Sequence, residues 1–267
     1  MTSLCNRSLP ITSTSLGRWI PWWVASGQQQ MQIDRWLLTD AIEQGSPQPI
    51  LRFYGWQRAT LSWGCHQQRV EVDGDPLVGC IDQVRRPTGG RAVFHQSYRD
   101  EAELTYCLVM PYRGTANRRQ AYRELCQFLR LGLASWGIVL DEGSGIPDHA
   151  VHYSQKTSCF ASQTAADLSW RGQKVIGSAQ LWQRGYVLQH GSMILQPNRP
   201  LWEKVLPGSS QQVIGLAEIV GQPIDRAALM ESLLKAASQY FGCGWQAQPL
   251  TPQEYEASGR DPLWVSP

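Results

Sequence analysis

Charged side chains are scarce in this sequence. They make up 17% of its 267 residues, and 24 lysines and arginines against 22 aspartates and glutamates leave a formal net charge of +2. Proteins whose main partner is a nucleic acid concentrate positive charge on one face, so we predict no nucleic-acid partner. Because 42% of the residues are hydrophobic, the chain can bury a large core, and an intrinsically disordered protein is excluded.

A long apolar run is also absent. No segment approaches the roughly 20 consecutive apolar residues that cross a bilayer, and we predict no membrane association. The first 33 residues contain no Asp or Glu and many Ser and Thr. That composition is a feature of organelle transit peptides, but the Arg-rich amphipathic pattern of those peptides is missing. We therefore expect a soluble protein of the cytoplasm.

The seven cysteines form no CxxC pair and have no metal-ligand spacing with the five histidines, so the sequence predicts no metal site. An odd, scattered set is typical of free thiols in a reducing compartment. Such a thiol becomes a nucleophile where a cation or a base lowers its pKa. Cys159 is the first candidate, because its polar-flanked segment TSCFAS follows a long loop, where a substrate can reach it. Cys65, beside His66, is the second.

The segment that follows Cys159 supplies candidate partners. Lys174 opens an apolar strand that ends in small residues, which let a ligand chain lie close to the backbone. These small residues are Gly177, Ser178 and Ala179. A lone lysine near a turn is most often a solvated hairpin residue, and that alternative stays open. His190, in the segment LQHGS, can act as an acid or base or serve as a hydrogen-bonded structural residue.

The most unusual stretch is RRPTGGRAVFH, residues 85–95. Its glycines permit positive φ and bring backbone N–H groups close to a ligand. Its arginines present forks of donors to carboxylate or phosphate oxygens. A basic hairpin turn explains the Gly-Gly pair taken alone. The candidate binding residues are Arg85, Arg86, Thr88, Gly89, Gly90, Arg91 and His95.

Hydrophobic periodicity predicts long helices at 28–44, 117–136 and 223–241, with a further helical turn at 252–257. Strands are predicted at 18–26, 50–56, 60–63, 77–86, 92–95, 103–110, 138–140, 158–161, 167–170, 173–181 and 186–195, the last two forming a hairpin with glycine in its turn. Pro21 indicates that the first strand is an edge strand. This order favours an α+β fold with a mostly antiparallel sheet flanked by helices. We divide the chain into a poorly ordered N-terminus (1–17), one catalytic domain (18–245) and a short C-terminal tail (246–267).

Taken together and in this order, three groups of residues resemble the lipoate/biotin protein ligase superfamily: RRPTGGRAVFH, SCF followed by GQKVIGSAQ, and LQHGS. Within it they are most similar to the cysteine-dependent octanoyltransferases of the LipM type. MQIDRWLL and SWGCHQ resemble the family's first helix and its next strand and turn. The resemblance runs over about residues 18–243, and the specificity lies in the combination, since each motif alone is weak.

The resemblance implies a catalytic domain of the class II synthetase and biotin-ligase type with an acyl tunnel. It implies that Cys159 is the nucleophile that carries an acyl thioester and that Lys174 lowers its pKa. Arg85, Arg86, Thr88, Gly89 and Gly90 would line the mouth of the pocket, and Gly177, Ser178 and Ala179 would lie along the acyl chain. The implied reaction transfers an octanoyl group from octanoyl-acyl carrier protein to the lysine of a lipoyl domain or a glycine-cleavage H protein, with no cofactor.

The same segment departs from the pattern of the ATP-dependent lipoate ligases. Their loop typically has three glycines followed by His-Asp, whereas this chain has Arg91 at the third glycine and Gln96 after His95. The LipM-like branch also has Arg at that position, and Gln96 matches neither pattern well. Two alternatives remain open. One is a lipoate or biotin ligase that requires ATP and Mg²⁺, with Lys174 polarising carbonyl and phosphate oxygens. The other is a catalytically silent paralogue that binds lipoyl domains or carrier proteins.

Overall fold

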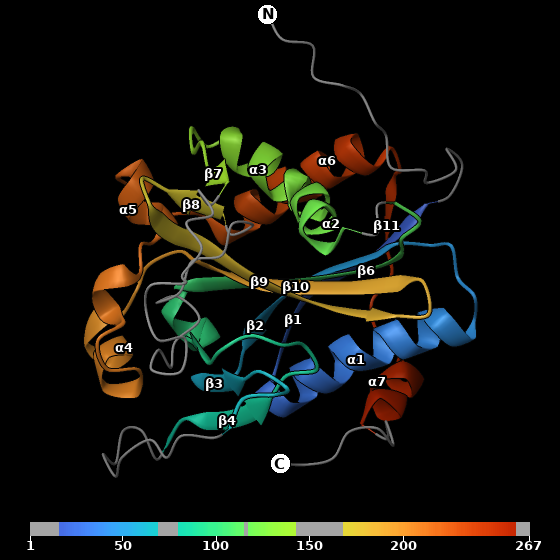
Figure 1. Cartoon of the computed structure of the whole chain (residues 1–267), viewed down its shortest axis with the longest axis horizontal. Coiled ribbons are helices and arrows are strands. Elements are labelled where there is room, and N and C mark those ends of the chain that lie inside the picture. The colour runs from blue at the N-terminus through green and yellow to red at the C-terminus, as the bar shows by residue number, and fades with distance from the viewer. Residues whose placement is uncertain (1–15, 69–79, 115–116, 143–167, 260–267) are drawn as a thin grey trace, which may run out of the picture.

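The computed structural model of the chain describes residues 16–68, 80–114, 117–142 and 168–259. A large sheet runs through the middle of the molecule (Figure 1), with the strand order β11-β1-β2-β6-β10-β9-β8-β7. Strand β1 is parallel to both of its neighbours, and the other five adjacent pairs are antiparallel. The predicted α+β fold with a mostly antiparallel sheet is therefore confirmed. The bounds of these strands are β1 Gly17–Ala25, β2 Ile50–Trp56, β6 Glu103–Pro111, β7 Asp141–Glu142, β8 Leu168–Trp170, β9 Gln173–Gln183, β10 Tyr186–Ile194 and β11 Trp245–Ala247.

The two faces of the sheet carry different layers (Figure 1). Helices α2 (Arg118–Leu125), α3 (Gln127–Ala134) and α6 (Arg226–Phe241) cover one face and share the largest apolar core with it. Helix α1 (Gly27–Glu43) packs on the other face through a second core. A small sheet with the order β4-β3-β5 lies on the α1 side. Its strands are β3 Thr60–Trp63, β4 Asp82–Arg85 and β5 Val93–His95.

Several predicted elements are confirmed closely. Strands β2 and β3 have the predicted bounds. Helix α1 starts one residue before its predicted start, where Ser26 and Gln29 form a capping box that satisfies free N–H groups of the first turn. The hairpin β9–β10 turns at Arg184 and Gly185, both with positive φ, which matches the twist of the two strands.

The predicted helix 117–136 is two helices, because the helical hydrogen bonding is interrupted at Cys126. The backbone at Cys126 keeps right-handed helical angles, with φ −88° and ψ −8°. The hydrophobic period therefore continues across the break, and the sequence pattern cannot show it. The strand predicted at 138–140 is wrong, since the strand of this region is β7, which begins at Asp141.

The prediction that Pro21 marks an edge strand is also wrong, because β1 lies between β11 and β2. Proline lacks the N–H that a ladder requires, and two local features accommodate it. Strand β11 pairs only with residues 17–19 of β1. On the other side, the pairing with β2 shifts register between Ile20 and Trp23, around the proline.

The remaining predictions differ at element ends or fall outside the described residues. The predicted helix 223–241 begins at Arg226, where Asp225 is the N-cap, and the predicted strand 77–86 is β4 within its described part. Short helices α4 (Arg199–Val205) and α5 (Leu216–Val220) were not predicted, because so few turns give no clear period. The predicted strand 158–161 and residues 1–15 of the predicted N-terminal segment lie outside the described residues.

Residues 246–259, the described part of the predicted C-terminal tail, belong to the packed structure. Strand β11 extends the sheet beside β1, and helix α7 (Pro252–Ser258) lies beside α1. Arg18 of β1 forms an ion pair with Glu254 of α7 at 2.7 Å. These contacts tie the C-terminal residues to the first strand and the first helix.

Candidate functional site

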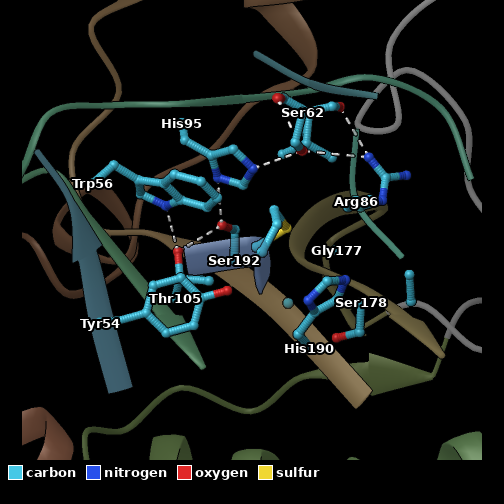
Figure 2. Close-up of a pocket in the computed structure, with 14 residues that line it drawn as sticks. Tyr54, Trp56, Ser62, Arg86, His95, Thr105, Gly177, Ser178, His190 and Ser192 are labelled. Carbon is cyan, nitrogen blue, oxygen red and sulfur yellow. Dashed lines mark hydrogen bonds between the residues drawn. The ribbon is translucent and has the colours of Figure 1, made fainter. Parts of the chain in front are cut away.

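A cavity lies on the α1 side of the large sheet, between that sheet and the small one. It holds about 380 Å³ of empty space, part of it open to solvent. Figure 2 shows side chains from β2, β3, β5, β6 and β10 converging on it. The residues proposed from the sequence that line it are Arg86, His95, Gly177, Ser178, Ala179 and His190.

The sheet register explains why small residues of β9 and polar residues of β10 meet at the cavity. Gly177 pairs with Ser192, and Ala179 pairs with His190. Gly191 lies so close to β9 that an added Cβ would be 2.6 Å from the carbonyl oxygen of Gly177. Strands β9 and β10 therefore present backbone and short side chains at the same end of the cavity, which leaves room for a ligand.

Five other residues were proposed from residues 85–91, the RRPTGGR segment: Arg85, Thr88, Gly89, Gly90 and Arg91. None of them is among the described residues that line the cavity. Arg85 donates from Nη1 to three carbonyl oxygens of the turn after β3, including that of Gly64 at 3.0 Å. Arg86 donates to the carbonyl oxygens of Gly89 and Arg91, each at 2.7 Å. Both arginines therefore fix the backbone around the cavity, and ligand binding by this segment stays a prediction.

The turn after β3 packs tightly on this segment, and we expect its glycine to be essential to stability. A Cβ at Gly64 would lie 1.9 Å from the carbonyl oxygen of Gly90, whose φ is 93°. Gly64→Ala should lower the free energy of unfolding by about 1–3 kcal/mol, the usual cost of overpacking. The matched control is Gly89→Ala, because a Cβ there meets nothing within 4 Å. Urea unfolding of both variants measures the difference, and equal stabilities would contradict the tight packing.

A buried charge cluster holds His190. Its Nδ1–H donates to Oδ2 of Asp34 at 2.7 Å, and its Nε2 lies 2.7 Å from the Thr88 hydroxyl. Oδ1 of Asp34 forms an ion pair with Nε of Arg52 at 3.2 Å, and the Tyr54 hydroxyl donates to Oδ2 at 2.9 Å. Burial alone would raise the pKa of Asp34, but the Arg52 charge and the His190 hydrogen bond outweigh it and lower that pKa. This cluster joins α1, β10 and the RRPTGGR segment.

A second buried cluster surrounds His95. Its Nε2 lies 2.8 Å from the Ser62 hydroxyl, and its Nδ1 lies 2.7 Å from Oε1 of Glu103. The Trp56 ring stacks on the imidazole with centroids 3.9 Å apart. Burial, more than the nearby Arg86 charge, lowers the pKa of His95, and the Glu103 carboxylate only partly opposes this. The imidazole is therefore neutral near pH 7.

Lys174 is buried, with 4% of its surface exposed. The alternative of a solvated hairpin lysine is therefore excluded. Its position on β9 is opposite Ser169 of β8, three residues before Gly177. Cys159 lies outside the described residues, so the relation between this thiol and Lys174 stays a prediction.

Cys107 is fully buried beside Asp34, and burial raises the pKa of its thiol. This makes Cys107 a poor nucleophile.

Sequence patterns missed most of the partners of the two histidines. Asp34 stands in the apolar stripe of α1, and a carboxylate at such a position signals a buried partner. Glu103 opens a strand of almost entirely buried residues and gives the same signal. Ser62 and Ser192 carried no signal, because serine is common in strands and loops alike.

Residues 26–238 match the family model of the lipoyl protein ligase A/B catalytic domain. The chain belongs to this family. A curated relative named octanoyltransferase LipM, from Symbiobacterium thermophilum, is 32% identical over 245 residues, which cover 85% of this chain and 87% of the relative. A relative of the same name from Bacillus subtilis is 30% identical, over 82% of this chain and 83% of the relative. Another from Carboxydothermus hydrogenoformans is 38% identical, over 64% of this chain and 62% of the relative.

Solved structures of this family have the same fold. Lipoate-protein ligase A bound with ATP matches with a TM-score of 0.75 and 19% identity, over 92% of this chain and 94% of the other. A bi-partite lipoate protein ligase from Thermoplasma acidophilum matches with a TM-score of 0.70 and 17% identity, over 92% and 91%. At these identities the likeness establishes the fold alone.

Among the described residues, no helix combines the length and apolarity of a membrane span. The His, Cys, Asp and Glu side chains of the same residues form no group of three that is arranged to hold a metal ion.

Proposed function

We propose that this protein is an octanoyltransferase that acts in protein lipoylation. The observation that carries the proposal is its similarity to curated octanoyltransferases over most of the chain, as in the relative that matches 85% of it. The cavity supports the proposal, because its walls are mainly apolar and its β9 side consists of Gly177, Ser178 and Ala179. Such a wall suits an unbranched acyl chain, which needs apolar contact and little width.

Cys159 is the proposed nucleophile. Its thiolate attacks the carbonyl carbon of the octanoyl thioester of acyl carrier protein, a new C–S bond forms, and the carrier thiol leaves with a proton. The lysine amine of a lipoyl domain or a glycine-cleavage H protein then attacks the Cys159 thioester. An amide forms, the C–S bond breaks, and the Cys159 thiol is restored. The acyl group is already activated as a thioester, so the reaction needs neither ATP nor another cofactor.

Lys174 is the proposed cation that favours the thiolate and stabilises the oxyanion of each step. Its burial supports this role, because a buried ammonium is costly unless an anion lies close to it. A cytoplasmic location is part of the proposal. The five described cysteines are all free, which suits a reducing compartment.

The second candidate is an ATP-dependent lipoate ligase, and one observation favours it: a ligase that binds ATP has the same fold. Against it stands Arg91, where the ligases typically have a third glycine. A side chain at that position fills space that a nucleotide phosphate would need. The third candidate, a silent paralogue, would bind lipoyl domains without turnover.

The choice of acyl donor separates these candidates. We expect the purified protein to octanoylate a lipoyl domain when it is incubated with octanoyl-acyl carrier protein and no ATP. Intact-mass spectrometry of the lipoyl domain measures the product. Free octanoate with ATP and Mg²⁺ should give none. The reverse pattern would establish the ligase, and no product with either donor would establish the silent paralogue.

A further inference from the structure

Ser62, His95 and Glu103 form one hydrogen-bonded line at the wall of the cavity (Figure 2). The side chains come from β3, β5 and β6, which converge here although the chain separates them by up to 41 residues. The Ser62 hydroxyl lies 2.8 Å from Nε2 of His95, and Nδ1 of His95 lies 2.7 Å from Oε1 of Glu103. This is the order serine, imidazole, carboxylate with hydrogen-bond distances throughout.

The direction of these hydrogen bonds is fixed by the carboxylate. Oε1 of Glu103 accepts from the Thr105 hydroxyl at 3.1 Å and from the Ser192 hydroxyl, and Oε2 accepts from the backbone N–H of Gln96 at 2.7 Å. A carboxylate with such donors accepts from the imidazole as well, so the proton of the neutral ring lies on Nδ1. Nε2 then carries a lone pair, and the Ser62 hydroxyl must donate to it.

His95 is held in the state and orientation that a general base requires. Burial lowers its pKa, so Nε2 is free to accept a proton near pH 7. The ionisable groups that face it are Glu103, Arg86 and His190. The Trp56 ring stacks on the imidazole at an interplanar angle of 20°, and its Nε1–H donates to the Thr105 hydroxyl at 2.9 Å. This packing keeps the ring from turning away from Ser62.

Ser62 also has a cation beside it. Nη1 of Arg86 donates to the Ser62 carbonyl oxygen at 3.0 Å and lies 3.4 Å from its hydroxyl oxygen. A fixed guanidinium at that distance can stabilise an oxyanion that forms next to the hydroxyl. Ser62, His95 and Arg86 all line the cavity.

We propose that Ser62, His95 and Glu103 are a catalytic triad that hydrolyses medium-chain acyl esters and thioesters held in the cavity. Such a triad is recognised by its geometry and roles, and it recurs on unrelated folds. The activity would be additional to acyl transfer and would not use Cys159. In a transferase it would release an acyl group that no acceptor collects.

The proposed steps balance with water as the only co-reactant. Oγ of Ser62 attacks the acyl carbonyl carbon, and Nε2 of His95 takes the hydroxyl proton. The bond from the acyl carbon to the leaving sulfur or oxygen breaks, and His95 passes the proton to that leaving group. Water then attacks the Ser62 ester and gives a proton to His95. The ester bond breaks, a fatty acid leaves, and His95 returns the proton to Ser62.

The test uses the full chain with Cys159→Ala, which removes the proposed transfer nucleophile. We expect this protein to hydrolyse p-nitrophenyl octanoate and to take up one alkyl fluorophosphonate group, which peptide mapping places on Ser62. Adding Ser62→Ala should abolish the label and reduce hydrolysis by roughly 100-fold or more. The matched control adds Ser209→Ala instead, which removes a buried serine hydroxyl that is not among the residues lining the cavity and should leave both signals unchanged.

A label on any other residue, or hydrolysis that survives Ser62→Ala, would overturn the triad. If the Ser62→Ala protein does not fold, as judged by thermal unfolding, the mapped position of the label in the Cys159→Ala protein still decides the matter. Acyl transfer is assayed separately on the unmodified protein, which keeps Cys159, by the mass of the lipoyl domain, and the same protein is treated with the label. A protein that transfers but takes no label disproves the triad alone, and one that takes the label but never transfers disproves the proposed function alone.

Discussion

Replacing Cys159 with alanine should abolish the hydroxylamine-sensitive octanoyl thioester on the protein. It should also reduce transfer to a lipoyl domain by roughly 1,000-fold or more, because removal of a covalent nucleophile leaves only binding and electrostatic stabilisation. Intact-mass spectrometry after incubation with octanoyl-acyl carrier protein measures the adduct. Brief treatment with neutral hydroxylamine should remove it from the unmodified protein, since thioesters are cleaved under conditions that spare amides.

The matched control is Cys80→Ala, which removes an exposed thiol and should leave both adduct and transfer unchanged. Cys65→Ala gives the decisive contrast. Cys65 is half-buried in the turn after β3 and is the alternative nucleophile. If the adduct persists in Cys159→Ala and disappears in Cys65→Ala, the assignment of Cys159 is wrong and the chemistry takes place at the turn beside the RRPTGGR segment.

The sequence predicted the layers of this fold well because each long element carries its own signal. Helix α1 has a capping serine and an apolar stripe, and the hairpin β9–β10 has a glycine at its turn. The prediction for Pro21 failed because it used a local rule at a place where the neighbouring strand β11 is only three residues long. The break at Cys126 escaped detection because it leaves the helical period intact.

The cavity shows a different limit of prediction from sequence. The small residues of β9 and the histidines of β5 and β10 carry recognisable chemistry, and they could be proposed from their motifs. The partners that set the state of those histidines come from remote positions. Asp34 lies 156 residues before His190, and no spacing rule joins a helix residue to a strand residue so far along the chain. Sheet register and layer packing bring them together, and these become visible only in three dimensions.

Asp34→Asn should lower the free energy of unfolding by about 3–5 kcal/mol, the cost of removing one partner of a buried ion pair. Asp34 is fully buried, and Arg52 has 1% of its surface exposed. The amide would keep the size of the side chain but leave the Arg52 charge without its counter-charge. It would also weaken the hydrogen bond that orients His190, so we expect slower acyl transfer at temperatures where the protein is still folded. Urea unfolding measures the stability.

The matched control is Asp40→Asn on the same helix. Asp40 is half-buried, and burial raises the pKa of its carboxyl. Its charge therefore does not favour the folded state, and Asp40→Asn should change the free energy of unfolding by no more than about 0.5 kcal/mol.

The effect of Asp34 should also depend on pH. Its folded pKa is lowered, so its ionisation contributes stability that is present above the unfolded pKa of about 3.9 and is lost as the pH falls through the folded value. The stability difference between the unmodified protein and Asp34→Asn should therefore shrink below about pH 4. A difference that is small at pH 7, or that does not shrink in acid, would contradict the role of Asp34 as the charged centre of this cluster.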